Sequence, residues 1–71
     1  PYLMIAASPP SAVELSWDSE AILRYQLEYT RHLQTNQWQS LGTQLEGSGF
    51  TMCVTNSVSE PARFYRLVLE R

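Results

Sequence analysis

The sequence has few of the residues that usually carry chemistry. Among its 71 residues, Cys53 is the only cysteine and His32 is the only histidine, and lysine does not occur. A single cysteine excludes a disulfide within the chain and a cysteine-rich metal site. Because Cys53 lies in an apolar, strand-like segment, we expect it to be buried as a small hydrophobic residue. No N-x-S/T motif is present, so N-linked glycosylation at that motif is not encoded.

Charge and long apolar runs are also scarce. The formal net charge is −2, and the five basic residues are arginines dispersed along the chain. Without a basic patch, we expect no nucleic-acid partner. No apolar run approaches the ~20 residues of a membrane-spanning helix, so we expect no membrane span. Hydrophobic residues make up 44% and charged residues 17% of the chain, which is typical of a globular protein. We therefore expect one small domain over residues 1–71.

The sequence does contain repeated alternation of apolar and polar residues. Helical periodicity is not sustained anywhere, although the polar segment 31–37 could hold one helical turn. Six strand-like segments are separated by turn signals. Gly42 is predicted to end a strand, and Gly47 and Gly49 are predicted to lie in a turn. The predicted strands are residues 2–8, 12–17, 22–30, 38–42, 50–55 and 63–69. This pattern predicts an all-β domain of half-buried antiparallel strands.

A period of two assigns each strand residue to the core or to solvent. The residues predicted to form one buried cluster are Val13, Leu15, Trp17, Tyr25, Leu27, Met52, Val54, Tyr65 and Leu67. Tyr29, Phe50 and Leu69 are predicted on the same inward faces. Phe64, Arg66 and Val68 are predicted to face outward.

The segments "AVELSW", "RYQLEY" and "PARFYRLVL" resemble strands B, C and F of fibronectin type III domains. Trp17, Tyr25 and Tyr65 match the tryptophan and tyrosines of that pattern. The chain more closely resembles short modules at the C-termini of large secreted bacterial proteins. This resemblance implies a small Ig-like antiparallel β-sandwich and an extracellular or cell-surface location. It also implies that the Tyr65 hydroxyl bonds to backbone near Glu60-Pro61.

The chain departs from that family at its end. A fibronectin type III domain has a seventh strand, G, but only Glu70 and Arg71 follow the last predicted strand. The sequence therefore predicts a six-stranded sandwich that lacks strand G and has an open edge. The apolar segment 2–8 could cover that edge within the chain, or it could pair with a neighbouring subunit. We favour the neighbour, because Pro9-Pro10 is expected to decouple this segment from the second strand. The predicted assembly interface comprises Tyr2, Leu3, Met4, Ile5, Ala6, Phe64, Arg66 and Val68.

No set of residues indicates catalysis, a metal or another cofactor. His32 lies in a polar segment without a cysteine or carboxylate at ligand spacing, and we interpret it as a surface residue. Glu14 and Glu28 could face outward on neighbouring strands, but such carboxylates on an open sheet are normally solvated. The "GSG" turn lacks the lysine and helix of a phosphate loop. We expect the protein not to be an enzyme.

Two functional classes remain. The first is a non-enzymatic extracellular structural protein, whose copies self-associate into a fibre or surface assembly. The alternative is a carbohydrate-binding or adhesion module of a larger secreted bacterial protein. For that role the candidate contacts are Tyr29, His32 and Trp38, because planar rings stack on sugar faces. An inert spacer is a third and weaker reading.

Overall fold

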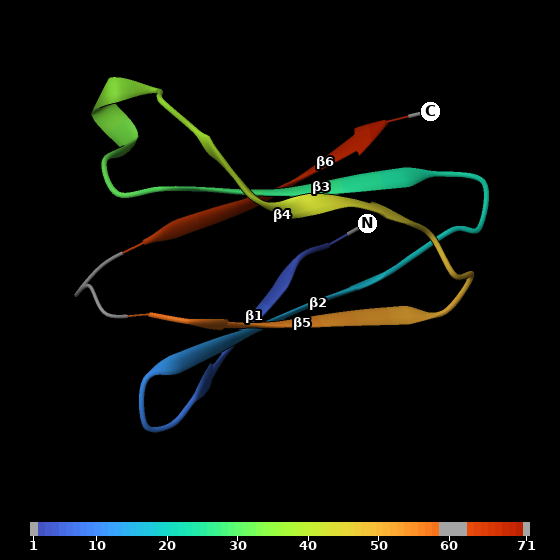
Figure 1. Ribbon diagram of the computed structural model, residues 1–71, viewed down its shortest axis with the longest axis horizontal. Coiled ribbons are helices and arrows are strands. Elements are labelled where there is room, and N and C mark those ends of the chain that lie inside the picture. Colours follow the sequence, from blue (N-terminus) through green and yellow to red (C-terminus); the bar gives the residue numbers. More distant parts are fainter. Residues whose placement is uncertain (1, 59–62, 71) are drawn as a thin grey trace.

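The computed structural model describes residues 2–58 and 63–70. Its elements are β1 (Met4–Ser8), β2 (Ala12–Asp18), β3 (Arg24–Thr30), the 3-10 turn η1 (Leu33–Thr35), β4 (Gln39–Glu46), β5 (Thr51–Ser57) and β6 (Phe64–Glu70). The strands form two antiparallel sheets, which we call sheet A (order β1-β2-β5) and sheet B (order β4-β3-β6). Figure 1 shows the two sheets as the two layers of a sandwich-like arrangement. The prediction of an all-β chain is confirmed.

The core lies between the central strands of the two sheets. Leu15 and Trp17 of β2 and Tyr25 and Leu27 of β3 are at most 1% exposed. The Trp17 and Tyr25 ring centroids are 5.7 Å apart. The other five predicted core residues, Val13, Met52, Val54, Tyr65 and Leu67, are partly buried against this cluster. Alternation predicted which face of each strand points inward. The inward side chains of β2 and β3 are fully covered because each of these central strands has a neighbouring strand on both sides.

Strand β4 is longer than the sequence indicated. The prediction ended it at Gly42 and placed a turn over 43–49, but β4 continues to Glu46. Gly42 has φ of +71°, and the pairing register of β3 with β4 shifts between Tyr25 and Leu27. An irregularity of this kind fits a glycine that bends the strand without ending it. Reading Gly42 as a strand end was therefore wrong.

Strand β1 belongs to sheet A of its own chain. It pairs with β2 from Met4 opposite Ser16 to Ser8 opposite Ala12. The expectation that Pro9-Pro10 decouples the segment from β2 is wrong, because the chain simply reverses there into an antiparallel hairpin. The alternative in which the segment covers β6 within the chain is also wrong. In the described part of the chain, β6 pairs with β3 alone. Exchange of β1 with a neighbouring subunit stays a prediction.

Three side chains lie in a different environment from the one predicted. Cys53 is exposed, because it points outward between the inward-facing Met52 and Val54. Phe50 is 79% exposed. It precedes β5 in a turn whose backbone is held by Ser19, which donates a hydrogen bond to the Phe50 carbonyl at 2.7 Å. Leu69 stands opposite Tyr25 yet is 44% exposed, because β6 is an edge strand.

The Tyr65 hydroxyl has a different described partner from the predicted one. The Asn56 side chain donates to it, with 3.3 Å between Nδ2 and the hydroxyl oxygen. The predicted partner at Glu60-Pro61 lies outside the described residues. The observed bond links β5 of sheet A to β6 of sheet B. Tyr65 thus joins the two sheets near the end of β5 and the start of β6.

Candidate functional site

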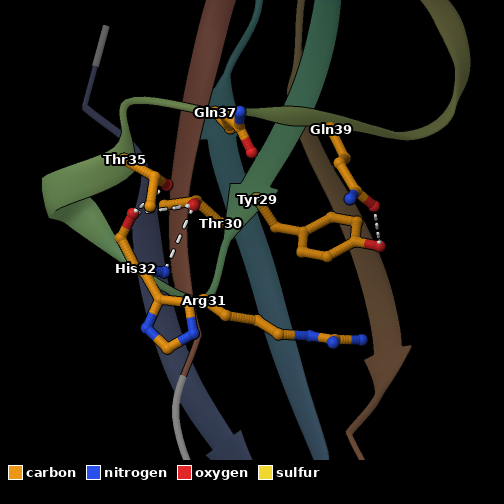
Figure 2. Close-up of a pocket in the computed structure, with 7 residues that line it drawn as sticks. All are labelled: Tyr29, Thr30, Arg31, His32, Thr35, Gln37 and Gln39. Carbon is orange, nitrogen blue, oxygen red and sulfur yellow. Dashed lines mark hydrogen bonds between the residues drawn. The ribbon is translucent and has the colours of Figure 1, made fainter.

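A polar hollow lies at one end of sheet B, beside η1 (Figure 2). It encloses about 200 Å³ and is lined by Tyr29, Thr30, Arg31, His32, Thr35, Gln37 and Gln39. Two of the three candidate carbohydrate contacts, Tyr29 and His32, therefore line the same hollow. The end of β3, the 3-10 turn and the start of β4 bring them together.

Hydrogen bonds fix the walls of this hollow. The Tyr29 hydroxyl donates to Oε1 of Gln39 at 2.7 Å, which ties β3 to β4. The Thr30 hydroxyl oxygen lies 3.3 Å from the His32 backbone N–H, which donates to it. The Thr35 hydroxyl donates to the His32 carbonyl at 3.0 Å. These bonds hold the backbone of His32, while its imidazole projects away from Gln37 and Gln39 (Figure 2).

Trp38 does not line this hollow. Tyr29 pairs with Gln39 across sheet B, and adjacent strand residues point to opposite faces. Trp38 stands beneath Arg66, whose guanidinium carbon is 4.2 Å from the ring centroid. Arg66 also binds Glu28, with 2.7 Å between Nε and Oε1. Trp38 therefore belongs to the outer face of sheet B, and the three candidates do not form one aromatic platform.

The rings of Tyr29 and Trp38 each have one face covered by an arginine side chain. The Arg63 guanidinium carbon lies 4.4 Å from the Tyr29 ring centroid, in the same arrangement as Arg66 over Trp38. Such cation–π contacts are typical of stabilising surface pairs. A sugar would have to use the opposite faces of these rings or displace the arginines.

A second hollow of about 300 Å³ lies at the other end, by Asp18, Ser19, Glu20 and Tyr25. Its polar groups serve the fold. The Glu20 backbone N–H donates to the Tyr25 hydroxyl at 2.8 Å, and the Ser48 N–H donates to Ser19 Oγ at 3.0 Å. Gly47 closes the same region, where a Cβ would lie 1.8 Å from the Glu20 carbonyl oxygen. The "GSG" segment is a packed turn.

The remaining candidates for chemistry are dispersed. Glu14 lies on β2 of sheet A and Glu28 on β3 of sheet B, so the idea that they occupy neighbouring strands is wrong. Partial desolvation raises the pKa of the Cys53 thiol, and the Glu14 carboxylate raises this pKa further. Among residues 2–58 and 63–70, no group of three or more His, Cys, Asp or Glu could hold a metal ion. No helix in those ranges is long and apolar enough to cross a membrane.

The predicted assembly residues lie on two edge strands. Met4 and Ile5 of β1 are 52% and 53% exposed, and Tyr2, just before β1, is 90% exposed. Phe64 of β6 is 42% exposed, Arg66 is exposed, and Leu3 and Val68 are half-buried. Sequence reasoning missed Leu69 as an edge residue, because alternation shows which face a residue is on and not whether its strand is central.

Comparisons with known proteins give no further guide. No family model, curated protein or solved structure matches the chain.

Proposed function

We propose that the protein is a non-enzymatic extracellular structural subunit, of the fibronectin type III-like kind, whose copies self-associate through open sheet edges into a fibre or surface assembly. The observation that carries the proposal is the set of exposed apolar side chains on the edge strands β1 and β6, of which β6 also carries the exposed charged residues Arg66 and Glu70. Strand β1 contains no charged residue, and its Met4 and Ile5 are more than half exposed. An apolar edge strand without a neighbour is a ready template for pairing with another chain.

The extracellular location rests on the resemblance to modules of secreted bacterial proteins. The order of sheet B supports the same comparison. In that comparison β6 would take the position of strand F, beside β3 in the position of strand C, and strand G would pair at the outer edge of β6.

Charge placed on the edges tests the proposal. Ile5→Lys on β1 and Leu69→Lys on β6 should weaken self-association about tenfold or more, which corresponds to about 1.4 kcal/mol. Thr43→Lys on β4 and Thr55→Lys on β5 are matched controls, since both threonines are exposed on the other two edge strands. Light scattering after size exclusion and electron microscopy give the readout. A monomeric wild-type chain at high concentration would rule the proposal out.

A carbohydrate-binding or adhesion module of a larger secreted protein is the second candidate. The polar hollow by η1 favours it, because amide, hydroxyl and guanidinium groups converge there. The opposite placement of Trp38 and the arginines over both rings count against it. Titration of the labelled protein with neutral oligosaccharides tests this role. Changes in NMR chemical shift that are confined to Tyr29, His32 and Gln37, and that are lost in Gln37→Ala, would support this role. No change in chemical shift at millimolar sugar would dismiss it.

A further inference from the structure

The four edge strands of the two sheets are not alike. The edge strand β4 of sheet B and the edge strand β5 of sheet A present mainly polar exposed side chains, such as Thr43, Gln44, Thr51 and Thr55. The exposed large apolar residues within strands of the described chain are Met4, Ile5, Phe64 and Leu69, all on β1 or β6. Solvated edges normally carry polar or charged residues, as β4 and β5 do. The contrast marks β1 and β6 as the edges suited to contact with protein.

The two apolar edges lie on the same side of the molecule. Figure 1 draws β1 and β6 fainter than β4 and β5, which places both of them on the far side of that view. Ile5 stands opposite Leu15, and Leu69 stands opposite Tyr25, and both partners are fully buried. Ile5 and Leu69 nevertheless are 53% and 44% exposed. The core is therefore open to solvent along the seam between β1 and β6.

We propose that two copies of the chain pair about a two-fold axis, with β6 of each copy beside β1 of the other. This inference rests on the proposed function and names the contact through which copies join. Strands β1 and β6 run in opposite directions (Figure 1). A rotation of 180° about an axis along the strands exchanges the two layers and keeps the strand directions. It thus sets β6 antiparallel to the partner's β1 at both seams.

The pairing explains the exposed residues on both sheets at once. Each sheet would contain six strands in the order β4-β3-β6-β1-β2-β5, the last three from the partner. Ile5 and Leu69 would then be covered by the neighbouring strand, and the polar strands β4 and β5 would remain as the outer edges. Since both apolar edges face the same side, one partner covers both, and edge pairing closes at two copies. These edges alone would then give a pair, and a fibre or surface assembly would need a further contact between pairs.

Cross-linking between single cysteines tests the arrangement. In a Cys53→Ser background, Ala6→Cys and Val68→Cys place thiols on the outer faces of β1 and β6, since Ala6 stands opposite Glu14 and Val68 opposite Gln26. A short bismaleimide should give cross-linked dimers when the two single variants are mixed, and none above background with either alone. Thr43→Cys mixed with Val68→Cys is the matched control and should not cross-link.

The double variant Ala6→Cys/Val68→Cys distinguishes a closed pair from an open chain. A product that stops at two chains supports the two-fold pair. A ladder of larger products would overturn the closed pair while leaving self-association through these edges in place. Cross-linking of Val68→Cys alone would overturn the β6–β1 pairing. Failure to cross-link in every mixture, together with a monomeric mass by light scattering, would overturn both this inference and the proposed function.

Discussion

At the scale of the residue, Trp17 is the side chain on which the core depends most. It is fully buried against Tyr25, and its indole Nε1 has no hydrogen-bond partner within the described chain. We expect Trp17→Ala to lower the free energy of unfolding by about 3–5 kcal/mol, which is most of what so small a domain has. Trp17→Phe should cost less, because it fills much of the space and removes the unpaired N–H. Urea unfolding measures both, with the exposed Phe50→Ala as control. An Ala variant as stable as the wild type would contradict the core assignment.

A second prediction at this scale concerns the thiol of Cys53. Partial desolvation and the nearby Glu14 carboxylate raise its pKa, so less thiolate is present at a given pH. We expect slow alkylation near neutral pH and a rate that rises with pH through the raised pKa. Glu14→Gln should move the rate profile to lower pH, since the carboxylate no longer opposes ionisation. Iodoacetamide kinetics across pH measure this, with Glu46→Gln as control. An unchanged profile in Glu14→Gln would leave desolvation as the whole cause.

At the scale of the element, the outer face of sheet B is fastened by Arg66. This side chain covers Trp38 next to β4 and binds Glu28 on β3. The Arg66 and Glu28 side chains are 46% and 20% exposed, so the solvent-screened ion pair is worth about 1 kcal/mol or less. We expect Arg66→Ala to cost more than Glu28→Gln, because it also uncovers the Trp38 ring.

A double-mutant cycle separates the two contacts of Arg66. The coupling energy between Glu28→Gln and Arg66→Ala should shrink in 1 M salt, where screening is strong. The part of the Arg66→Ala effect that survives salt reports the packing on Trp38. Equal costs of the two single variants at both salt concentrations would show that Trp38 gains nothing from Arg66.

The sequence was informative for the central elements and less so for the edges. Strands β2 and β3 alternate strictly because each is buried on one face and solvated on the other, so Leu15, Trp17, Tyr25 and Leu27 could be assigned to the core. Strand β1 is apolar on both faces, and a uniform strand contains no signal for its partner or its register.

The candidate site depended on a register that no local pattern encodes. Tyr29 and Trp38 were grouped because one polar loop separates them in sequence. Their opposite faces follow from the pairing of Tyr29 with Gln39, which the turn η1 sets. Likewise, the exposure of Ile5 and Leu69 follows from strand order, because an inward-facing residue is buried only when its neighbours cover it.

At the scale of the whole molecule, stability and association should be coupled. Four hydrophobic residues of the described chain are fully buried, and the core stays open beside Ile5 and Leu69. A pair that covers those residues is more stable than its separate chains, so the melting temperature must rise with protein concentration. For a dimer, a hundredfold increase in concentration is worth about 1.4 kcal/mol per chain, or about 5–10 °C for a domain of this size.

Thermal unfolding followed by circular dichroism across that range of concentration checks this coupling. We expect Leu69→Lys to melt at one temperature regardless of concentration, since the variant places a charge where the partner strand would pack. Thr55→Lys should retain the wild-type dependence, because β5 remains an outer edge of the pair. The comparison separates loss of association from loss of folding: a Leu69→Lys chain that still melts cooperatively, at the temperature of the dilute wild type, has lost the partner alone. A wild-type melting temperature that does not move with concentration would mean that the open seam is stable in water without a partner.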